Sequence, residues 1–303
     1  MDKKRYFFGF DIGGTNIVCG LLDGAFGIVD KQSRAFEPLG EGGIADAMLQ
    51  MAKALAAKNG VPFESVASVG VCIPGSVDVE RGIVIDAHNL GLHDSPFRKA
   101  VETRFNKRTA LLNDADAAAL AEARLGALKG KANAILVTIG TGIGVGILLG
   151  GRLFHGGRGM GVEAGHMVMD IHGEGCTCGR TGCIETLCSA AWLAKRAKST
   201  LGSASSVRIL VDMAKRGNSI CKRIWDEYAE NLGNALASYI NILDPEVIAL
   251  GGGVSGAGEF LLDSIRPHVD KGSFFREPTP IVIAAMGNDA GIVGACIFAN
   301  ENQ

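Results

Sequence analysis

The sequence predicts a protein of the α/β class that is built from two lobes of related topology. Short apolar strands alternate with helical segments along the chain, an order typical of this class. In addition, a strand, a tight glycine turn and a second strand follow one another twice, at residues 6–22 and at residues 134–149. Two such copies favour two related lobes, although glycine-rich hairpins also occur in α/β proteins without a repeat.

Apolar periodicity and glycine define the expected elements. Apolar residues 6–10 and 17–22 flank the turn at residues 11–16, so a hairpin is expected there. Ile44 and Leu55 lie at the ends of a helical apolar pattern, which Gly60 terminates. The other expected elements are strands at residues 134–137, 145–149 and 247–250 and helices at residues 115–128, over most of residues 189–243 and from about residue 259.

Composition restricts the possible partners. A net charge of −2 gives no basic surface for nucleic acid or for a membrane. The longest apolar runs, such as residues 135–138 and 247–250, are too short to span a bilayer. The basic start of the chain is followed by only a few apolar residues before Asp11, which indicates a first strand and not a signal peptide. We therefore expect a cytoplasmic protein without nucleic-acid or membrane partners.

One cluster of cysteine and histidine has the spacing of a metal site. His166, Cys176, Cys178 and Cys183 offer an imidazole and three thiols within eighteen residues, a plausible tetrahedral zinc set. Four protein ligands leave no open position for water, so a structural role is favoured. The alternative is three free thiols beside an unrelated histidine. The other five cysteines are expected to be buried and reduced, namely Cys19, Cys72, Cys188, Cys221 and Cys296.

Three glycine-rich turns could face a bound nucleotide. Residues 11–16 and 138–144 offer bare amides and Thr hydroxyls, and Asp11 could hold a magnesium ion or its waters. Residues 251–256 fit G-x-G-x-x-G after a strand, which raises a dinucleotide fold as an alternative. The acidic residue about twenty positions on, Asp270, ends a helical region and not a second strand, so a loop near a nucleotide's adenosine is favoured.

Several polar residues lie in otherwise apolar surroundings. Asn113 and Asp114 stand where a strand meets a helix, so they could cap that helix or supply a general base. Asn89 could be an ordinary turn residue. Glu163 and Glu185 flank the metal cluster and could be surface charges.

Together these motifs resemble the ROK family of sugar kinases and repressors, over nearly the whole chain. The family's two phosphate motifs resemble residues 11–16 and 138–144, and its catalytic motif is similar to residues 113–119. Its sugar and zinc signature resembles residues 163–166 together with residues 176–185. All four motifs occur in the family's order.

The resemblance implies the two-lobed actin/hexokinase-like (ribonuclease H-like) fold with a central cleft. We expect a small lobe of residues 1–116 with a C-terminal helix at about residues 290–303. The large lobe would comprise residues 117–289 and would carry the zinc segment 166–183.

The resemblance also implies an ATP- and Mg²⁺-dependent hexose kinase with a structural zinc ion. Asp114 would accept the proton of the sugar 6-hydroxyl as that oxygen attacks the γ-phosphorus. The sugar would be held by Asn89, Asn113, Asp114, Glu163, His166 and Glu185. ATP would be held by Asp11, Gly13, Gly14, Thr15, Thr138, Gly140, Thr141, Gly142, Gly252 and Gly253. His166 would bind zinc through one ring nitrogen and a sugar hydroxyl through the other.

Glucose is the expected sugar, which would make the activity that of a glucokinase. Allose, fructose, N-acetylmannosamine and N-acetylglucosamine are alternatives, and a sugar-binding regulator without catalysis is a different class of function. Two departures from the family pattern bear on the site. Asp116 replaces the commoner Asn, and the loop after Asn89 has no Trp. The resemblance further suggests a homodimer or homotetramer.

Overall fold

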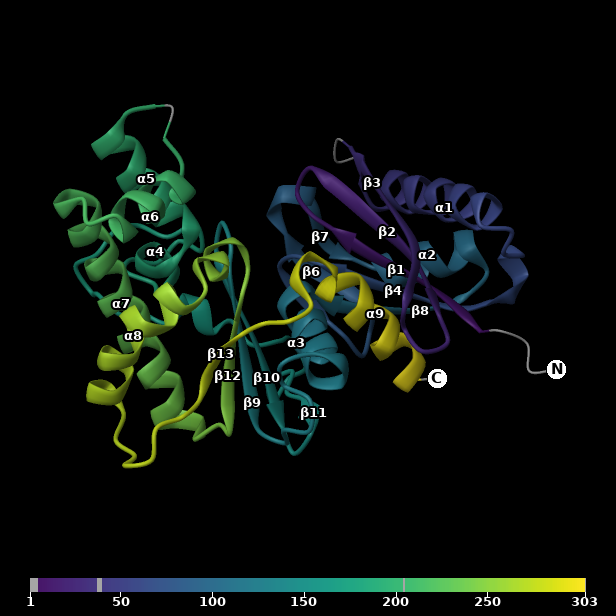
Figure 1. The fold of residues 1–303 in the computed structure, drawn as a ribbon. Coiled ribbons are helices and arrows are strands. Elements are labelled where there is room, and N and C mark those ends of the chain that lie inside the picture. Colours follow the sequence, from purple (N-terminus) through teal and green to yellow (C-terminus); the bar gives the residue numbers. More distant parts are fainter. Residues whose placement is uncertain (1–4, 37–39, 204, 303) are drawn as a thin grey trace. The chain divides into compact units, whose positions relative to one another are not determined.

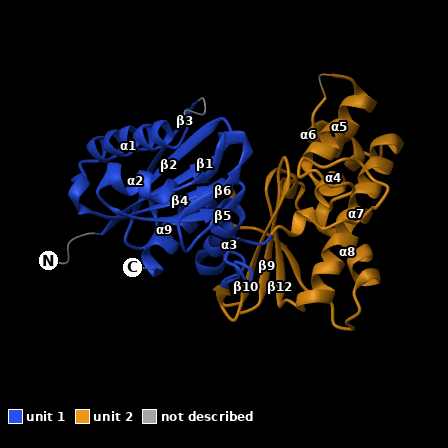
Figure 2. Ribbon diagram, turned by 180° about the vertical axis from the view of Figure 1, so that it is seen from behind, with its two compact units in different colours: residues 1–129, 153–162, 288–303 blue, residues 130–152, 163–287 orange. Residues whose placement is uncertain are grey.

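The computed structural model describes residues 5–36, 40–203 and 205–302, and these form two compact units (Figure 2). Unit 1 consists of Met1–Lys129, Leu153–Val162 and Asn288–Gln303, and unit 2 of Gly130–Arg152 and Glu163–Gly287. Each unit contains a sheet and helices, which confirms the α/β class. The lobe boundaries expected from the sequence stay a prediction. Residues 1–4 of the basic start, where no signal peptide is expected, lie outside the described part.

Unit 1 contains a five-stranded sheet in the order β3-β2-β1-β4-β8 (Figure 1). The pair β1–β2 is antiparallel, which confirms the first predicted hairpin, and β2 pairs in the same way with β3. Strands β1, β4 and β8 are parallel, so their carboxyl ends meet at one edge of the sheet. The strands are β1 (Tyr6–Ile12), β2 (Asn16–Asp23), β3 (Ile28–Ala35), β4 (Val66–Ile73) and β8 (Arg108–Asn113).

Helix α9 (Ala290–Glu301) lies very close to this sheet because glycines face it. A Cβ atom at Gly9 would lie 2.3 Å from the carbonyl oxygen of Ile292, and one at Gly70 would lie 2.1 Å from that of Ala295. Because strand side chains alternate in direction, Phe8 points to the opposite face, where it packs in the core that α1 (Gly40–Lys58) also enters. The predicted apolar face of α1 is confirmed by its buried residues Ile44, Met48, Met51, Ala52 and Leu55.

The remaining elements of unit 1 include helix α3 (Asp114–Leu125), which packs against α9. A second sheet has the order β5-β6-β7. These elements are β5 (Ser76–Asp78), β6 (Ile83–Ala87), β7 (Leu92–Ser95), α2 (Phe97–Phe105) and the 3₁₀ turns η1 (Phe63–Ser65), η2 (His88–Leu90) and η5 (Gly287–Asp289), the last of which begins in unit 2.

Unit 2 contains a second five-stranded sheet, in the order β11-β10-β9-β12-β13. The pair β9–β10 is antiparallel, while β9, β12 and β13 are parallel. The two sheets therefore share one pattern, a hairpin followed by parallel strands, which confirms the repeat seen in the sequence. The strands are β9 (Ala134–Ile139), β10 (Ile143–Leu149), β11 (Arg152–Leu153, which ends at the unit boundary), β12 (Val247–Gly251) and β13 (Ile281–Ile283).

Among the residues of unit 2 that the structure describes there are five helices, and the longest, α7 (Ser219–Leu243), has 25 residues. No helix within the described residues is long and apolar enough to cross a membrane. The other helices are α4 (Glu185–Cys188), α5 (Ala190–Leu201), α6 (Val207–Lys215) and α8 (Glu259–Gly272), with 3₁₀ turns η3 (Ala164–His166) and η4 (Gly253–Ala257).

Candidate active site and metal centre

In unit 1, the predicted base and the predicted magnesium ligand lie at the same edge of the sheet. The parallel register pairs Asp11 of β1 with Cys72 of β4, and the residue after Cys72 with Asn113 of β8. Burial raises the pKa of Asp11, and a hydrogen bond with Cys72 opposes this shift. Burial, followed by the negative charges of Asp11 and Asp114, raises the pKa of the Cys72 thiol well above its ordinary value. The two carboxylates thus lie close enough to act on one buried thiol.

Asn113 and Asp114, at the junction of β8 and α3, make different contacts. Asn113 is the N-cap of α3, and its Oδ1 atom accepts hydrogen bonds from the amides of Ala115 at 2.8 Å and Asp116 at 3.4 Å. Its Nδ2 atom donates to the carbonyl oxygen of Gly75 at 2.9 Å. Asp114 is the first residue of the helix, and its Oδ1 atom also accepts from the Ala115 amide at 2.8 Å. Asn113 therefore serves as the helix cap, and Asp114 stands at the first helical position beside it.

The first glycine turn lies beside the loop that holds Asn89. The Gly13 amide donates to the Asn16 carbonyl at 2.8 Å and closes the turn between β1 and β2. A Cβ atom placed on Gly14 would lie 3.5 Å from the Cβ of Asn89. Unit 1 therefore brings together the phosphate-binding candidates Asp11, Gly13, Gly14 and Thr15 with the sugar-binding candidates Asn89, Asn113 and Asp114.

The second glycine turn meets the third within unit 2. Strands β9 and β12 are parallel, and their register pairs Thr138 with Gly251 at the carboxyl ends. A Cβ atom on Gly252 would lie 2.4 Å from the carbonyl oxygen of Ile139, so the two loops touch. By contrast, a Cβ atom on Gly140 or on Gly253 would meet no atom within 4 Å. Open space beside exposed backbone suits a nucleotide. The contact between the two loops brings together the six ATP-binding candidates of unit 2, namely Thr138, Gly140, Thr141, Gly142, Gly252 and Gly253.

Turn η3, which follows Glu163 and ends at His166, is held from two sides. The hydroxyl of Tyr239 on α7 donates to the carbonyl oxygen of Ala164 at 3.1 Å. A Cβ atom on Gly165 would lie only 2.2 Å from the carbonyl oxygen of Ile143, so the turn rests directly on the start of β10. The Nε2 atom of His166 lies 3.9 Å from the Oε2 atom of Glu163. The two sugar-binding candidates are therefore neighbours.

Glu185 connects the metal segment to the second glycine turn. Its Oε2 atom accepts a hydrogen bond from the Ile143 amide at 3.0 Å, and its Oε1 atom lies 3.7 Å from the Sγ atom of Cys176. The absence of a side chain on Gly142 makes room for this carboxylate. Glu185 also begins helix α4.

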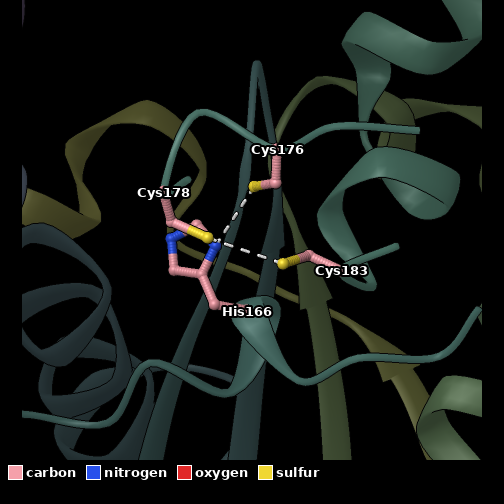
Figure 3. A group of neighbouring side chains, drawn as sticks. All are labelled: His166, Cys176, Cys178 and Cys183. Atoms are coloured by element: carbon pink, nitrogen blue, oxygen red, sulfur yellow. Dashed lines mark hydrogen bonds between the residues drawn. The ribbon is translucent and has the colours of Figure 1, made fainter. Parts of the chain in front are cut away.

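The four predicted zinc ligands converge, with all their ligand atoms within 4.8 Å of one another. Figure 3 shows the imidazole of His166 and the three sulfur atoms directed toward one another. The Sγ atoms of Cys178 and Cys183 are 3.6 Å apart, and the Sγ atom of Cys176 lies 3.5 Å from the Nδ1 atom of His166. A tetrahedral zinc ion would separate two sulfurs by about 3.7 Å and a sulfur and a nitrogen by about 3.5 Å. These residues fit zinc, with Nδ1 as the histidine ligand.

Backbone turns bring the cysteines to this point. The Cys176 amide donates to the Arg180 carbonyl at 2.7 Å, and the Gly179 amide donates to the Cys176 carbonyl at 3.0 Å. Gly179 and Gly182 have φ angles of 84° and 70°, which favour glycine. The turns between the cysteines therefore use backbone conformations that glycine adopts without strain.

Comparison with known proteins identifies the family. The family model described as "ROK family" matches residues 7–302. The chain belongs to the ROK family. A ROK-family glucokinase from Streptomyces griseus, solved in complex with glucose and AMPPNP, is 32% identical with a TM-score of 0.85, over 98% of this chain and 99% of that one. This likeness confirms the predicted sugar-kinase fold class.

Two curated relatives of this ROK chain have different names. A glucokinase from Halalkalibacterium halodurans is 34% identical, over 99% of this chain and 97% of that protein. An N-acetylmannosamine kinase from Yersinia pseudotuberculosis is 31% identical, over 96% of this chain and 97% of that protein. Similarity over the full length therefore extends to kinases of more than one sugar.

Sequence reasoning missed two supporting residues of the ROK chain. His155 pairs with Asp116 of α3, and the Tyr239 hydroxyl holds η3. The only signal was Asp116 itself, which departs from the commoner Asn of the family motif. Nothing in the local pattern marks Tyr239, because it lies 75 residues from its partner.

Proposed function

We propose that the chain is an ATP-dependent hexose kinase that transfers the γ-phosphate to the 6-hydroxyl of a sugar, with glucose as the preferred substrate. Full-length similarity to a glucokinase and to a structure that binds glucose and AMPPNP supports a hexose kinase. The observation that carries the mechanism is the position of Asp114. Asp114 is the first residue of helix α3, which begins at the same edge of the sheet as Asp11. The negative charges of both residues raise the pKa of the Cys72 thiol.

Asp114 acts as the general base in this proposal. The Ala115 amide orients its carboxylate, which accepts the proton of the sugar 6-hydroxyl as that oxygen becomes the nucleophile. Mg²⁺-ATP, when bound, supplies the phosphoryl group and neutralises part of its charge. Asp11 would hold the metal or its waters, and the glycine turns at residues 11–16 and 138–144 would bind phosphate oxygens through backbone amides and Thr hydroxyls.

The sugar hydroxyls would be held by side chains that donate and accept in pairs. In unit 1 these are Asn89 and Asn113, and in unit 2 they are Glu163, His166 and Glu185. Zinc, when bound, would fix the ring plane and tautomer of His166 through Nδ1. The Nε2 atom, which lies on the side of Glu163, would then donate to a hydroxyl. We also propose a cytoplasmic location and a homodimer or homotetramer, which light scattering would test.

A coupled ADP-release assay over a panel of sugars tests the proposal. The panel is glucose, allose, fructose, N-acetylmannosamine and N-acetylglucosamine. We expect the highest kcat/KM with glucose and a product phosphorylated on O6. Because an enzyme discriminates between substrates by the ratio of their kcat/KM values, rates must be compared as kcat/KM and not at one concentration. A higher value for another sugar would reassign the substrate but retain the kinase class.

Two variants test the role of Asp114. We expect Asp114→Ala to lower kcat by about 10²- to 10⁴-fold, since a positioned base contributes this much. The matched control is Asp226→Asn, which changes an exposed carboxylate on α7 that pairs with Lys222. An Asp114→Ala protein with wild-type sugar-dependent turnover would refute the base. Sugar binding without any ADP release by the wild-type chain would instead favour a regulator without catalysis.

A further inference from the structure

The first turn of α3 carries two carboxylates with opposite environments. Asp116 is buried, with 2% of its side chain exposed, and its Oδ2 atom lies 2.8 Å from the Nδ1 atom of His155. An α-helix turns by about 100° per residue, so side chains two residues apart point in nearly opposite directions. Fixing Asp116 toward the interior therefore fixes the direction in which Asp114 leaves the helix.

His155 is itself held in place by its surroundings. Its side chain is 20% exposed, and its ring meets the Phe298 ring of α9 edge-on, with centroids 6.0 Å apart and planes at 76°. Its carbonyl oxygen accepts a hydrogen bond from the Gly161 amide at 2.9 Å, which closes the loop of residues 155–161. The imidazole is thus a fixed partner for Asp116 and not a mobile surface group.

A buried carboxylate requires such a partner. A charge removed from water is costly unless it is paired or hydrogen-bonded, and removing one partner of a buried pair leaves the other uncompensated. Asp116 receives a hydrogen bond from an imidazole 39 residues away in sequence. The contact therefore ties the helix of the proposed base to the loop of residues 155–161, which leads through Val162 directly into Glu163.

We propose that His155 and Asp116 form a positioning pair that holds the first turn of α3, and with it Asp114, in its working orientation. This proposal rests on the proposed function, because it assigns the pair a task in that reaction. The pair acts through the helix and the loop, and neither residue is assigned a contact with sugar or ATP.

The first test compares two variants that each break one side-chain contact made by α3. We expect His155→Ala to lower kcat about tenfold to hundredfold, since small displacements of a reacting group cost this much, while the KM for ATP stays within about twofold. The control is Arg124→Ala, which removes the pair of Arg124 with Glu301 at the other end of the helix, where Nε lies 2.6 Å from Oε1. We expect its kcat to stay within about twofold of wild type. An equal loss of kcat in both variants would overturn the proposal.

Two further variants distinguish a loss of kcat caused by a displaced Asp114 from one caused by unfolding. In His155→Asn, the amide nitrogen can replace Nδ1 as donor, so we expect most of kcat to return. Asp116→Leu fills the same space without a buried charge, so this variant should fold even if His155→Ala does not. It still lacks the contact between residue 116 and His155. We expect it to lose kcat as His155→Ala does. A folded Asp116→Leu protein with wild-type kcat would refute the positioning role.

Hydrogen exchange gives a readout that does not depend on catalysis. Amides in a peptide covering residues 113–120 should exchange faster in His155→Ala than in wild type, and at the wild-type rate in Arg124→Ala. Unchanged exchange in His155→Ala would overturn the proposal even if the chain proved to have no kinase activity. Conversely, if Asp114→Ala is inactive while folded His155→Ala and Asp116→Leu keep full kcat, the kinase assignment stands and only the positioning pair fails.

Discussion

The carboxylate of Glu185 accepts a hydrogen bond from the backbone amide of Ile143 at 3.0 Å. This contact joins a residue proposed to bind sugar to the end of the second glycine turn, which is proposed to bind ATP. It lies between residues 42 positions apart in the sequence. Within unit 2, one hydrogen bond therefore connects a proposed sugar-binding residue with the turn that is proposed to bind ATP.

A methyl group at Gly142 should disturb sugar binding through Glu185. The Cβ of Gly142→Ala would lie 2.1 Å from the Oε2 atom of Glu185, so the carboxylate must move and lose its bond to Ile143. We expect the sugar KM to rise about tenfold, the cost of one charge-assisted hydrogen bond. The control is the same change in a Glu185→Ala background, where no clash remains. There, Gly142→Ala should change the sugar KM little further, whereas additive effects would contradict this explanation.

Loss of one thiolate should release the metal and weaken sugar binding. We expect Cys178→Ser to lose zinc, measured by metal analysis after gel filtration, because serine is a poor zinc ligand. The sugar KM should rise sharply, since His166 loses the bond that fixes its ring. Cys221→Ser, which changes a buried cysteine of α7 outside the cluster, should retain zinc. An unchanged sugar KM in zinc-free Cys178→Ser would contradict the role of the metal.

Removal of zinc should expose three thiols in a protein that otherwise has few reactive ones. Burial raises the pKa of four other cysteines, so their thiolate fractions are small: Cys19, Cys72, Cys188 and Cys296. We expect a thiol reagent at neutral pH to react slowly with the zinc-loaded protein. After a strong chelator is added, a colorimetric zinc indicator should report one zinc per chain, and the three cluster cysteines should react. Rapid reaction of all three before chelation would argue against bound zinc.

The contact between α3 and α9 should not tolerate a side chain on Gly294. A Cβ atom there would lie 1.7 Å from the carbonyl oxygen of Ala117, and a backbone atom cannot move aside as a flexible side chain can. Overpacking of this kind costs about 1–3 kcal/mol or more, so Gly294→Ala should lower the melting temperature by several degrees in calorimetry. Gly24→Ala is the control, because its Cβ would meet only ordinary contacts at 3.6 Å. Equal melting temperatures for the two variants would contradict the close packing.

Local sequence pattern predicts most of the fold, but it predicts few of the contacts that hold the site residues in place. The hairpins β1–β2 and β9–β10 follow from apolar runs on either side of a glycine turn, and the structure confirms both. The convergence of His166 with the three cysteines follows from ligand chemistry and short spacing.

The supporting contacts could not be predicted in the same way, because they join distant segments. The pair His155–Asp116 spans 39 residues, and the bond from Tyr239 to Ala164 spans 75. Helical or strand periodicity reports burial within one element and carries no information about which distant element lies opposite. The same limit applies to Gly142, where a glycine expected to free an amide for phosphate also makes room for Glu185.

The order of the segments has a consequence for synthesis on the ribosome. Helix α9 closes against Gly9 and Gly70 of the first sheet, yet it follows all of unit 2 in the chain. Domains generally fold as units while the chain emerges, the N-terminal one first. The face of the first sheet that α9 covers therefore lacks this helix until nearly all of the described chain has been translated. Completion of unit 1 during synthesis therefore depends on a helix that is translated after the whole of unit 2.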